Sequence, residues 1–61
     1  MTYSYSVSFE HDTKPVLTAR GPVEASDWSE AVRKAVRRAE AELKPRNYRS
    51  VVAVVELRDL G

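Results

Sequence analysis

The sequence predicts a small α+β protein in which a three-stranded antiparallel sheet carries one helix on one face. Three features support this prediction: apolar and polar residues that alternate near the N-terminus, a capped amphipathic segment in the middle, and an apolar run near the C-terminus. The 61 residues suffice for a single domain, residues 1–61. The expected element order is β-β-α-β, and a right-handed crossover through the helix gives the strand order 2-1-3.

The first expected strand, residues 3–10, alternates large apolar residues with small polar ones. Its apolar members are Tyr3, Tyr5, Val7 and Phe9, and serines stand between them. This period of two places the apolar side chains on one face of a sheet. Residues 11–15 contain turn formers, so the chain is expected to return through residues 16–20. The returning strand is expected to end near Gly21 and Pro22, or to continue to Glu24 past a bulge.

The middle of the chain predicts a helix that starts after Ser26 or Asp27. Either side chain can accept hydrogen bonds from N–H groups of the first turn, and Glu30 follows Asp27 by three residues, as in a capping box. The apolar residues recur at three- and four-residue steps and form one stripe: Trp28, Ala31, Val32, Ala35, Val36, Ala39 and Leu43. Within this stripe, Trp28 is expected to anchor the helix against the sheet.

A turn and an apolar strand are expected after the helix. Pro45 ends the helix, and Asn47 suits a left-handed turn. Residues 51–55 consist of valine and alanine, so they offer apolar side chains to both faces of the sheet, and both faces need covering. In the order 2-1-3 this strand lies at an edge, where it can pair with another chain. Residues 58–61 are expected to form a short polar tail.

The apolar third strand predicts a homodimer or a higher homo-oligomer. Val52 and Val54 are the expected interface residues, at the edge of the third strand or on the second face of the sheet. The serine-lined face of the sheet is the alternative surface for stacking on a second copy. The sequence does not decide between the edge and the serine-lined face.

Composition narrows the class of protein. Without cysteine and with one histidine, the chain offers neither a disulfide framework nor a zinc cluster, so oligomerisation is the remaining common stabiliser of so small a domain. The net charge of +1 predicts no general attraction to nucleic acid. No segment approaches the roughly 20 apolar residues of a membrane span, and the first residues lack the features of a signal peptide. We therefore expect a soluble cytoplasmic protein with no membrane association and no cofactor.

Catalytic residue types are sparse in this sequence. His11, the one histidine, stands between Glu10 and Asp12 in the expected hairpin turn, where a solvated turn is the simpler interpretation. The serines of the first strand have no expected base beside them, and the two glycines stand apart, so no phosphate-binding loop is present. The sequence predicts a protein that is not an enzyme.

Basic and aromatic residues are the better candidates for a contact surface. Four basic residues are expected on the helix face away from the apolar stripe: Arg33, Lys34, Arg37 and Arg38. Ion pairs of Glu30 with Lys34 and of Arg38 with Glu42 are expected to absorb part of this charge, so an ordinary solvated face is the alternative. The turn after the helix adds further donors and an aromatic ring that can stack on a ligand, or that simply covers the core. The predicted partner-binding residues are Arg37, Lys44, Arg46, Asn47, Tyr48 and Arg49.

Two resemblances can be named on these segments. Residues 23–26 (Val-Glu-Ala-Ser), 30–39 and 45–52 (Pro-Arg-Asn-Tyr-Arg-Ser-Val-Val) resemble small uncharacterised proteins of actinobacteria and their phages. This resemblance covers about half of the chain and implies no activity. Residues 30–39 also resemble the helix of dodecins, flavin-binding proteins that assemble as hollow shells, and helices of HicB-type antitoxins. The element order of dodecins is β-α-β-β and thus differs from the order expected here. When the two helices are matched, Tyr48 falls near the tryptophan that stacks on flavin in dodecins.

Three functions follow as hypotheses. The first is a protein-interaction module, a phage or phage-derived accessory protein that acts as a homo-oligomer on an unidentified protein partner. The second is a nucleic-acid-binding or antitoxin-like regulator that uses the basic helix face. The third is a dodecin-like carrier of flavin or another small molecule.

Overall fold

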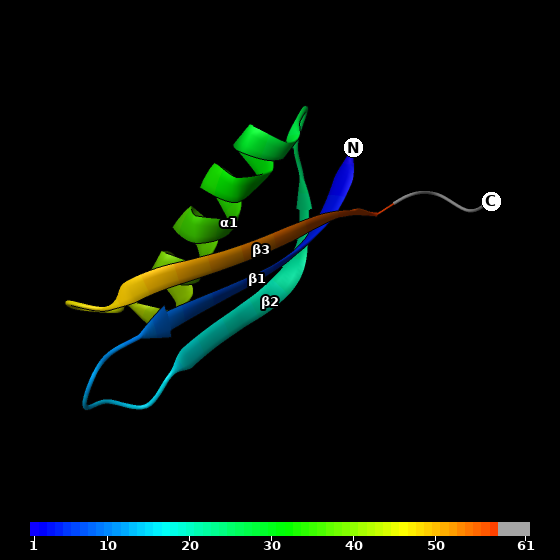
Figure 1. Cartoon of the computed structure of the whole chain (residues 1–61). Helices are drawn as coiled ribbons and strands as arrows, with labels where there is room; N and C mark the ends of the chain where they lie inside the picture. Colours follow the sequence, from blue (N-terminus) through cyan, green and yellow to red (C-terminus); the bar gives the residue numbers. More distant parts are fainter. Residues whose placement is uncertain (58–61) are drawn as a thin grey trace.

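The computed structural model describes residues 1–57, which form three strands and one helix. In chain order these are β1 (Thr2–Glu10), β2 (Leu17–Glu24), α1 (Trp28–Leu43) and β3 (Arg49–Leu57). The strands form one antiparallel sheet in the order β2-β1-β3, and α1 packs across one face of it (Figure 1). The predicted fold class, element order and strand order are confirmed. The predicted polar tail, residues 58–61, lies outside the described residues.

The core lies between α1 and the aromatic face of β1. Alternation along β1 directs four side chains toward α1, each at most 6% exposed: Tyr3, Tyr5, Val7 and Phe9. The helix meets them with three fully buried alanines, Ala31, Ala35 and Ala39. These small side chains let the helix backbone approach the sheet closely, so the large side chains of β1 fill the space between the two layers.

Strand β2 is longer than expected. It runs through Gly21 and Pro22 to Glu24 with an unbroken register against β1, so the predicted end near Gly21 is wrong and no bulge is needed to reach Glu24. A Cβ atom at Gly21 would lie 3.4 Å from the Tyr5 hydroxyl oxygen, so the Tyr5 ring covers the place of the missing side chain. Pro22 is accommodated because β2 is an edge strand.

The helix begins with a cap that the sequence predicts almost correctly. Asp27 Oδ1 accepts the Glu30 N–H at 2.8 Å, and the predicted ion pair between Glu30 and Lys34 is present at 3.1 Å. The Glu30 carboxylate, however, accepts from the N–H and hydroxyl of Ser26 and not from the cap residue. Hydrogen bonds from Lys34 and then from Ser26 lower the pKa of Glu30. Glu30 therefore stabilises the fold above the ordinary glutamate pKa, and this contribution is lost as the pH falls through the lowered value.

The helix ends at a left-handed residue that the sequence does not indicate. Lys44 has φ 49°, and its N–H donates to the carbonyl oxygen of Glu40 at 2.8 Å. Asn47 has φ 61°, so the predicted left-handed turn at this residue is confirmed. A left-handed lysine is uncommon and carries a conformational cost that a glycine would avoid. The helix stop thus depends on Pro45 and on this backbone hydrogen bond.

Removing the N-terminal cap is expected to destabilise the protein by about 1 kcal/mol. Asp27→Ala deprives the Glu30 N–H of its acceptor, whereas Ser29→Ala changes an exposed residue of the same helical turn. Urea denaturation followed by circular dichroism, at one protein concentration, measures both losses. An equal loss from the two variants would contradict the capping role of Asp27.

Candidate interaction surface

The basic residues of α1 divide into two groups in the structure. Lys34 Nζ donates to the carbonyl oxygen of Glu24 at 2.9 Å, and Arg38 Nη1 donates to that of Pro22 at 3.0 Å. The predicted ion pair of Arg38 with Glu42 is therefore wrong, because the guanidinium is engaged by β2. Both side chains fasten one flank of α1 to β2, so they contribute to the fold and are not a free contact surface.

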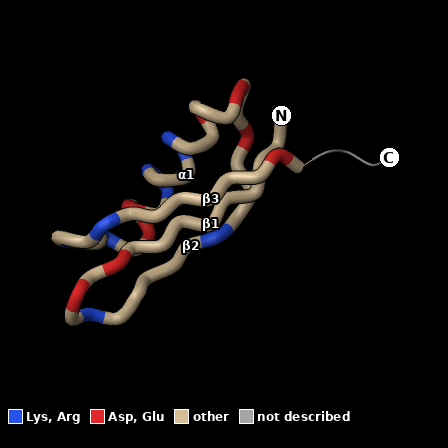
Figure 2. The backbone as a smooth tube through the Cα atoms, viewed as in Figure 1, with Lys and Arg blue, Asp and Glu red and all other residues tan. Residues whose placement is uncertain are grey.

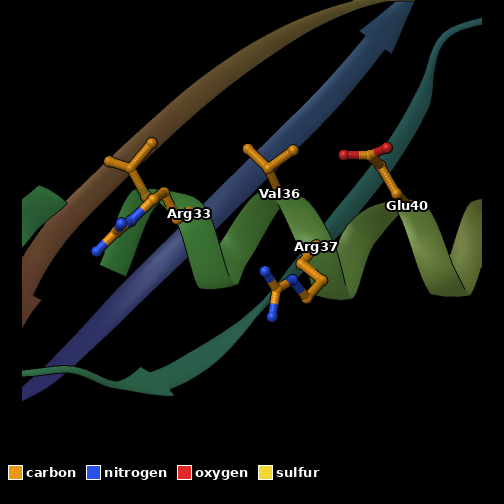
Figure 3. A pocket seen from close by; sticks show the side chains of 5 residues that line it. Arg33, Val36, Arg37 and Glu40 are labelled. Atoms are coloured by element: carbon orange, nitrogen blue, oxygen red, sulfur yellow. The ribbon is translucent and has the colours of Figure 1, made fainter. Parts of the chain in front are cut away.

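The remaining two, Arg33 and Arg37, lie exposed on the outer side of α1. They border an open hollow of about 520 Å³ together with Val32, Val36 and Glu40. Figure 3 shows Val36 and Glu40 on one side of the helix and Arg37 on the other. Among residues 1–57, neither arginine forms an ion pair within 4 Å. The hollow is a shallow basic surface of a single helix with two valines beside it.

The hollow also has a definite position relative to the sheet. At 100° per residue, Val32 and Val36 lie on the opposite flank of α1 from Lys34 and Arg38. Because Lys34 and Arg38 reach β2, the valine flank is the one above β3. The apolar part of the hollow therefore borders the free edge of β3.

The turn between α1 and β3 packs against the β1–β2 hairpin. The rings of Tyr48 and His11 have centroids 5.3 Å apart, and Lys14 Nζ lies 5.8 Å from the centre of the Tyr48 ring. Arg49 Nη2 donates to Asp12 Oδ1 at 3.3 Å. Figure 1 shows the two loops together at the end of the molecule away from the N-terminus. Local sequence spacing gives no sign of this contact, because only the sheet register brings residues so far apart in the chain together.

The predicted partner-binding residues are therefore not one cluster. Arg37 lies on α1, whereas the other five follow the helix at the loop end: Lys44, Arg46, Asn47, Tyr48 and Arg49. Asn47 and Arg49 line a hollow of about 150 Å³ with Glu10, His11 and Asp12. This hollow offers donors on one side and carboxylates on the other, so it suits polar contacts with a protein loop.

His11 has a local structural role in the hairpin. Its Nδ1 accepts the N–H of Thr13 at 3.1 Å, and the ring is half-buried beside Tyr48. Within residues 1–57, no three His, Cys, Asp or Glu side chains gather at distances that would hold a metal ion. The predicted turn at His11 is present, with one ring nitrogen engaged in it.

Trp28 does not anchor the core, and that prediction is wrong. It is 59% exposed, and its indole Nε1 donates to the carbonyl oxygen of Val54 on β3 at 3.4 Å. The alanines of α1 bring the helix too close to the sheet to leave room for an indole between them. Trp28, at the first helical residue, therefore lies beside the edge strand.

The two faces of β3 are now defined. Ser50, Val52, Val54 and Glu56 share the face that α1 covers, because they are paired with the inward residues of β1. Val52 and Val54 pack against the core, so their predicted place on the second face of the sheet is wrong. That Val52 and Val54 contribute to an oligomer interface at the edge of β3 stays a prediction.

The face of the sheet opposite α1 is uncovered, and its β1 and β3 part is uncharged between the strand ends. Val51, Val55 and Leu57 are 51%, 64% and 49% exposed on it, and they lie next to the serines of β1. Figure 2 shows that β1 carries no charged residue before Glu10 and that β3 carries none between Arg49 and Glu56. We call this combined surface of β1 serines and β3 apolar residues the open face.

No helix within residues 1–57 is long and apolar enough to cross a membrane. The resemblances to actinobacterial and phage proteins and to dodecins stay predictions. Comparison with protein-family models, with curated proteins and with solved structures finds no match to this chain.

Proposed function

We propose that this chain is a non-enzymatic protein-interaction module that acts as a homo-oligomer. The observation that carries the proposal is the exposed apolar side of β3, where Val51, Val55 and Leu57 are each about half exposed or more. Scattered apolar residues on a surface need no explanation, whereas contiguous ones mark an interaction site. A domain of this size also has little stability to spare, so association that buries these residues stabilises the fold.

The contacts to a further protein partner belong, in this proposal, to the loop end of the molecule and to Arg37. Tyr48 is packed beside His11 of the hairpin, so its ring loses little side-chain freedom when a partner binds, and Arg49 reaches the Asp12 carboxylate beside it. Lys44 and Arg46 are exposed beside them. The resemblance of residues 23–26, 30–39 and 45–52 supports a phage or phage-derived accessory protein, and the cysteine-free composition supports a cytoplasmic location.

The first test is the mass of the protein in solution, measured by light scattering across a salt series. The expected mass is that of two or more chains of 6.9 kDa each, and it should change little between low and high salt. Absorbance recorded on the same sample detects co-purifying nucleic acid or flavin. A monomer at every concentration would contradict the proposal, and a yellow sample would favour the dodecin-like carrier.

A nucleic-acid-binding regulator is the second candidate, because Arg33 and Arg37 are exposed on one side of α1 without an ion pair among residues 1–57. Phosphates are bound chiefly by such side chains, and each contact makes the affinity depend on salt. The regulator hypothesis requires affinity that falls steeply with salt and falls again when these two arginines are neutralised.

Under the interaction-module proposal, we expect the double variant Arg33→Gln, Arg37→Gln to leave a weak DNA or RNA affinity nearly unchanged at physiological salt. Fluorescence anisotropy with labelled DNA and RNA measures this affinity. Arg20→Gln is the matched control, because Arg20 is exposed on the opposite side of the sheet. A tenfold or larger loss confined to the double variant would promote the regulator over the interaction module.

A further inference from the structure

The direction of the backbone groups at the two sheet edges follows from one hydrogen bond. Ala25 N–H donates to the Met1 carbonyl oxygen at 3.0 Å, which continues the register in which Thr2 faces Glu24. Hydrogen-bonded pairs alternate along an antiparallel ladder. The odd-numbered residues of β1 therefore bond to β2, and the even-numbered ones bond to β3.

The same alternation assigns the backbone groups of β3. Because Ser6 pairs with Ala53, the N–H and carbonyl of Ala53 point toward β1. Those of the residues on either side, Val52 and Val54, point outward to the free edge. Ser50 and Glu56 continue this outward set. The indole of Trp28 meets the Val54 carbonyl, which agrees with the outward assignment.

The C-terminal half of the β2 edge is protected against strand addition. Pro22 and Glu24 belong to the outward set of β2, and Pro22 has no N–H to donate. Their carbonyl oxygens accept from Arg38 and Lys34. A proline and long basic side chains are common devices that prevent an edge from pairing with another chain.

The β3 edge has no comparable protection. Among residues 1–57, the Trp28 indole makes the one side-chain hydrogen bond to a β3 backbone group, and it is long at 3.4 Å. No proline interrupts β3, and no charged residue lies between Arg49 and Glu56 (Figure 2). The β2 edge is therefore protected over half of its length, whereas the β3 edge is left ready to pair.

The sequence of β3 is also symmetric. Residues 51–55, Val-Val-Ala-Val-Val, read the same in both directions about Ala53. A twofold axis requires the same surface on both partners, which a strand edge offers when it runs antiparallel to a copy of itself, and the symmetry of residues 51–55 sets like residues opposite each other when the axis lies at Ala53. On this basis, and resting on the proposed homo-oligomeric function, we propose that β3 pairs with β3 of a second copy about an axis at Ala53.

In this register, like residues meet across the axis. Val52 faces Val54 of the second copy as a hydrogen-bonded pair, and Val51 faces Val55 of the second copy on the open face. Ser50 faces Glu56 of the second copy, where a hydroxyl can donate to a carboxylate. The neighbouring registers oppose Arg49 to Val55 or Glu56 to Val52, so they place a charge beside a valine within the pairing, whereas in the proposed register the charge beside an apolar residue, Arg49 opposite Leu57 of the second copy, lies at the ends of the strands.

Pairing joins two three-stranded sheets into one sheet of six strands, with both helices on the same face. The apolar β3 residues of the two open faces become contiguous. Trp28 lies next to the axis because it contacts Val54, one residue from Ala53. The Val54 carbonyl has two lone pairs, so it can accept from the indole and from the second copy together. Trp28, the one tryptophan of the chain, therefore reports on the interface.

The test places charges at the axis. Ala53 is exposed on the open face, so a lysine there is tolerated by one copy but meets its own equivalent in the pair. Ala53→Lys and Ala53→Glu are each expected to weaken the dimer about 100-fold or more, because like charges are brought together. An equimolar mixture of the two variants is expected to restore the dimer. Light scattering over a concentration series gives the masses, and Trp28 emission shifts to longer wavelength where the dimer is lost.

Ser4→Lys is the matched control for the open face. Ser4 is exposed on the same face but belongs to the central strand β1, away from the proposed axis. The proposal expects this variant to keep the dimeric mass. If Ser4→Lys dissociates the dimer and Ala53→Lys does not, the copies stack through their open faces, and edge pairing is overturned while the homo-oligomeric function stands. A wild-type monomer at all concentrations overturns both.

If the charged variants fail to fold, a cysteine variant tests the β3–β3 pairing instead. Ala53 and its equivalent would form a non-hydrogen-bonded pair with Cα atoms about 4.5 Å apart, within the range that a disulfide spans. Since the chain has no other cysteine, Ala53→Cys is expected to form a covalent dimer under mild oxidation, and Ser4→Cys is not. Failure of Ala53→Cys to cross-link while the protein remains dimeric would overturn the proposed register.

Discussion

Ala35→Leu is expected to remove most of the stability of this protein. Ala35 is fully buried where α1 crosses the sheet, and added methylene groups would push the helix away from the large side chains of β1. Overpacking of this kind costs typically about 1–3 kcal/mol and occasionally more. The core of so small a domain supplies only about 3–5 kcal/mol. Urea denaturation followed by circular dichroism should show a much lower midpoint, or no folded baseline.

The same substitution at Ala41 is the control. Ala41 lies on α1 but is exposed, so Ala41→Leu changes little beyond helix propensity, a few tenths of a kcal/mol at most. Both variants must be compared at one protein concentration, because association contributes to apparent stability. If Ala35→Leu unfolds at the wild-type midpoint, the helix does not approach the sheet as closely as the buried alanines indicate.

Val7→Ala is expected to cost about 2–3 kcal/mol. Val7 is fully buried at the centre of β1, and the variant loses two methyl groups' worth of transfer free energy together with the packing around the cavity they leave. Thermal unfolding should show a drop of many degrees, since the domain is small. Val16→Ala removes the same atoms from a side chain that is 58% exposed, so its unfolding temperature should stay near that of the wild type. Equal losses from the two variants would contradict the burial of Val7.

The elements that sequence predicts well are those with one clear period. The alternation in β1 identifies its buried face, and the steps of three and four in α1 identify its stripe, because each pattern suits one secondary structure. Asp27 and Pro45 then mark the helix ends. Placing β1 between β2 and β3, with the usual right-handed crossover through the helix, gives the observed strand order, so the fold could be predicted from these patterns.

The faces of β3 could not be predicted, because valines occupy both odd- and even-numbered positions and so point to both faces of the sheet. Either register would bury valine, and only the pairing of Tyr5 with Val54 shows which valines face α1. The burial of Trp28 was wrongly predicted for a related reason. Its hydrophobicity and spacing place it in the apolar stripe, but the alanines leave no room for an indole beneath the helix.

Much of the candidate surface was also beyond sequence reasoning. Arg38 has a carboxylate four residues away, yet its guanidinium reaches a carbonyl of β2, a partner that exists only once the helix is docked. The contact of Tyr48 with His11 likewise depends on the length of the hairpin and the position of the following turn. Side-chain partners that come from distant elements are set by tertiary structure, and local spacing carries no signal for them.

In the proposed β3 pairing, the protected part of the β2 edge limits how far association can proceed. In the language of polymer chemistry, a unit with two reactive ends grows into a chain, whereas a unit with one reactive end stops at the first coupling. In the proposed pairing, Pro22 and the basic side chains above it hinder a second coupling along the C-terminal half of β2, so each copy has one favoured reactive edge. If β3 pairs with β3 of a second copy as proposed, growth by edge addition stops at two copies, and an apolar strand as unprotected as β3 can remain in the chain without becoming the seed of an aggregate.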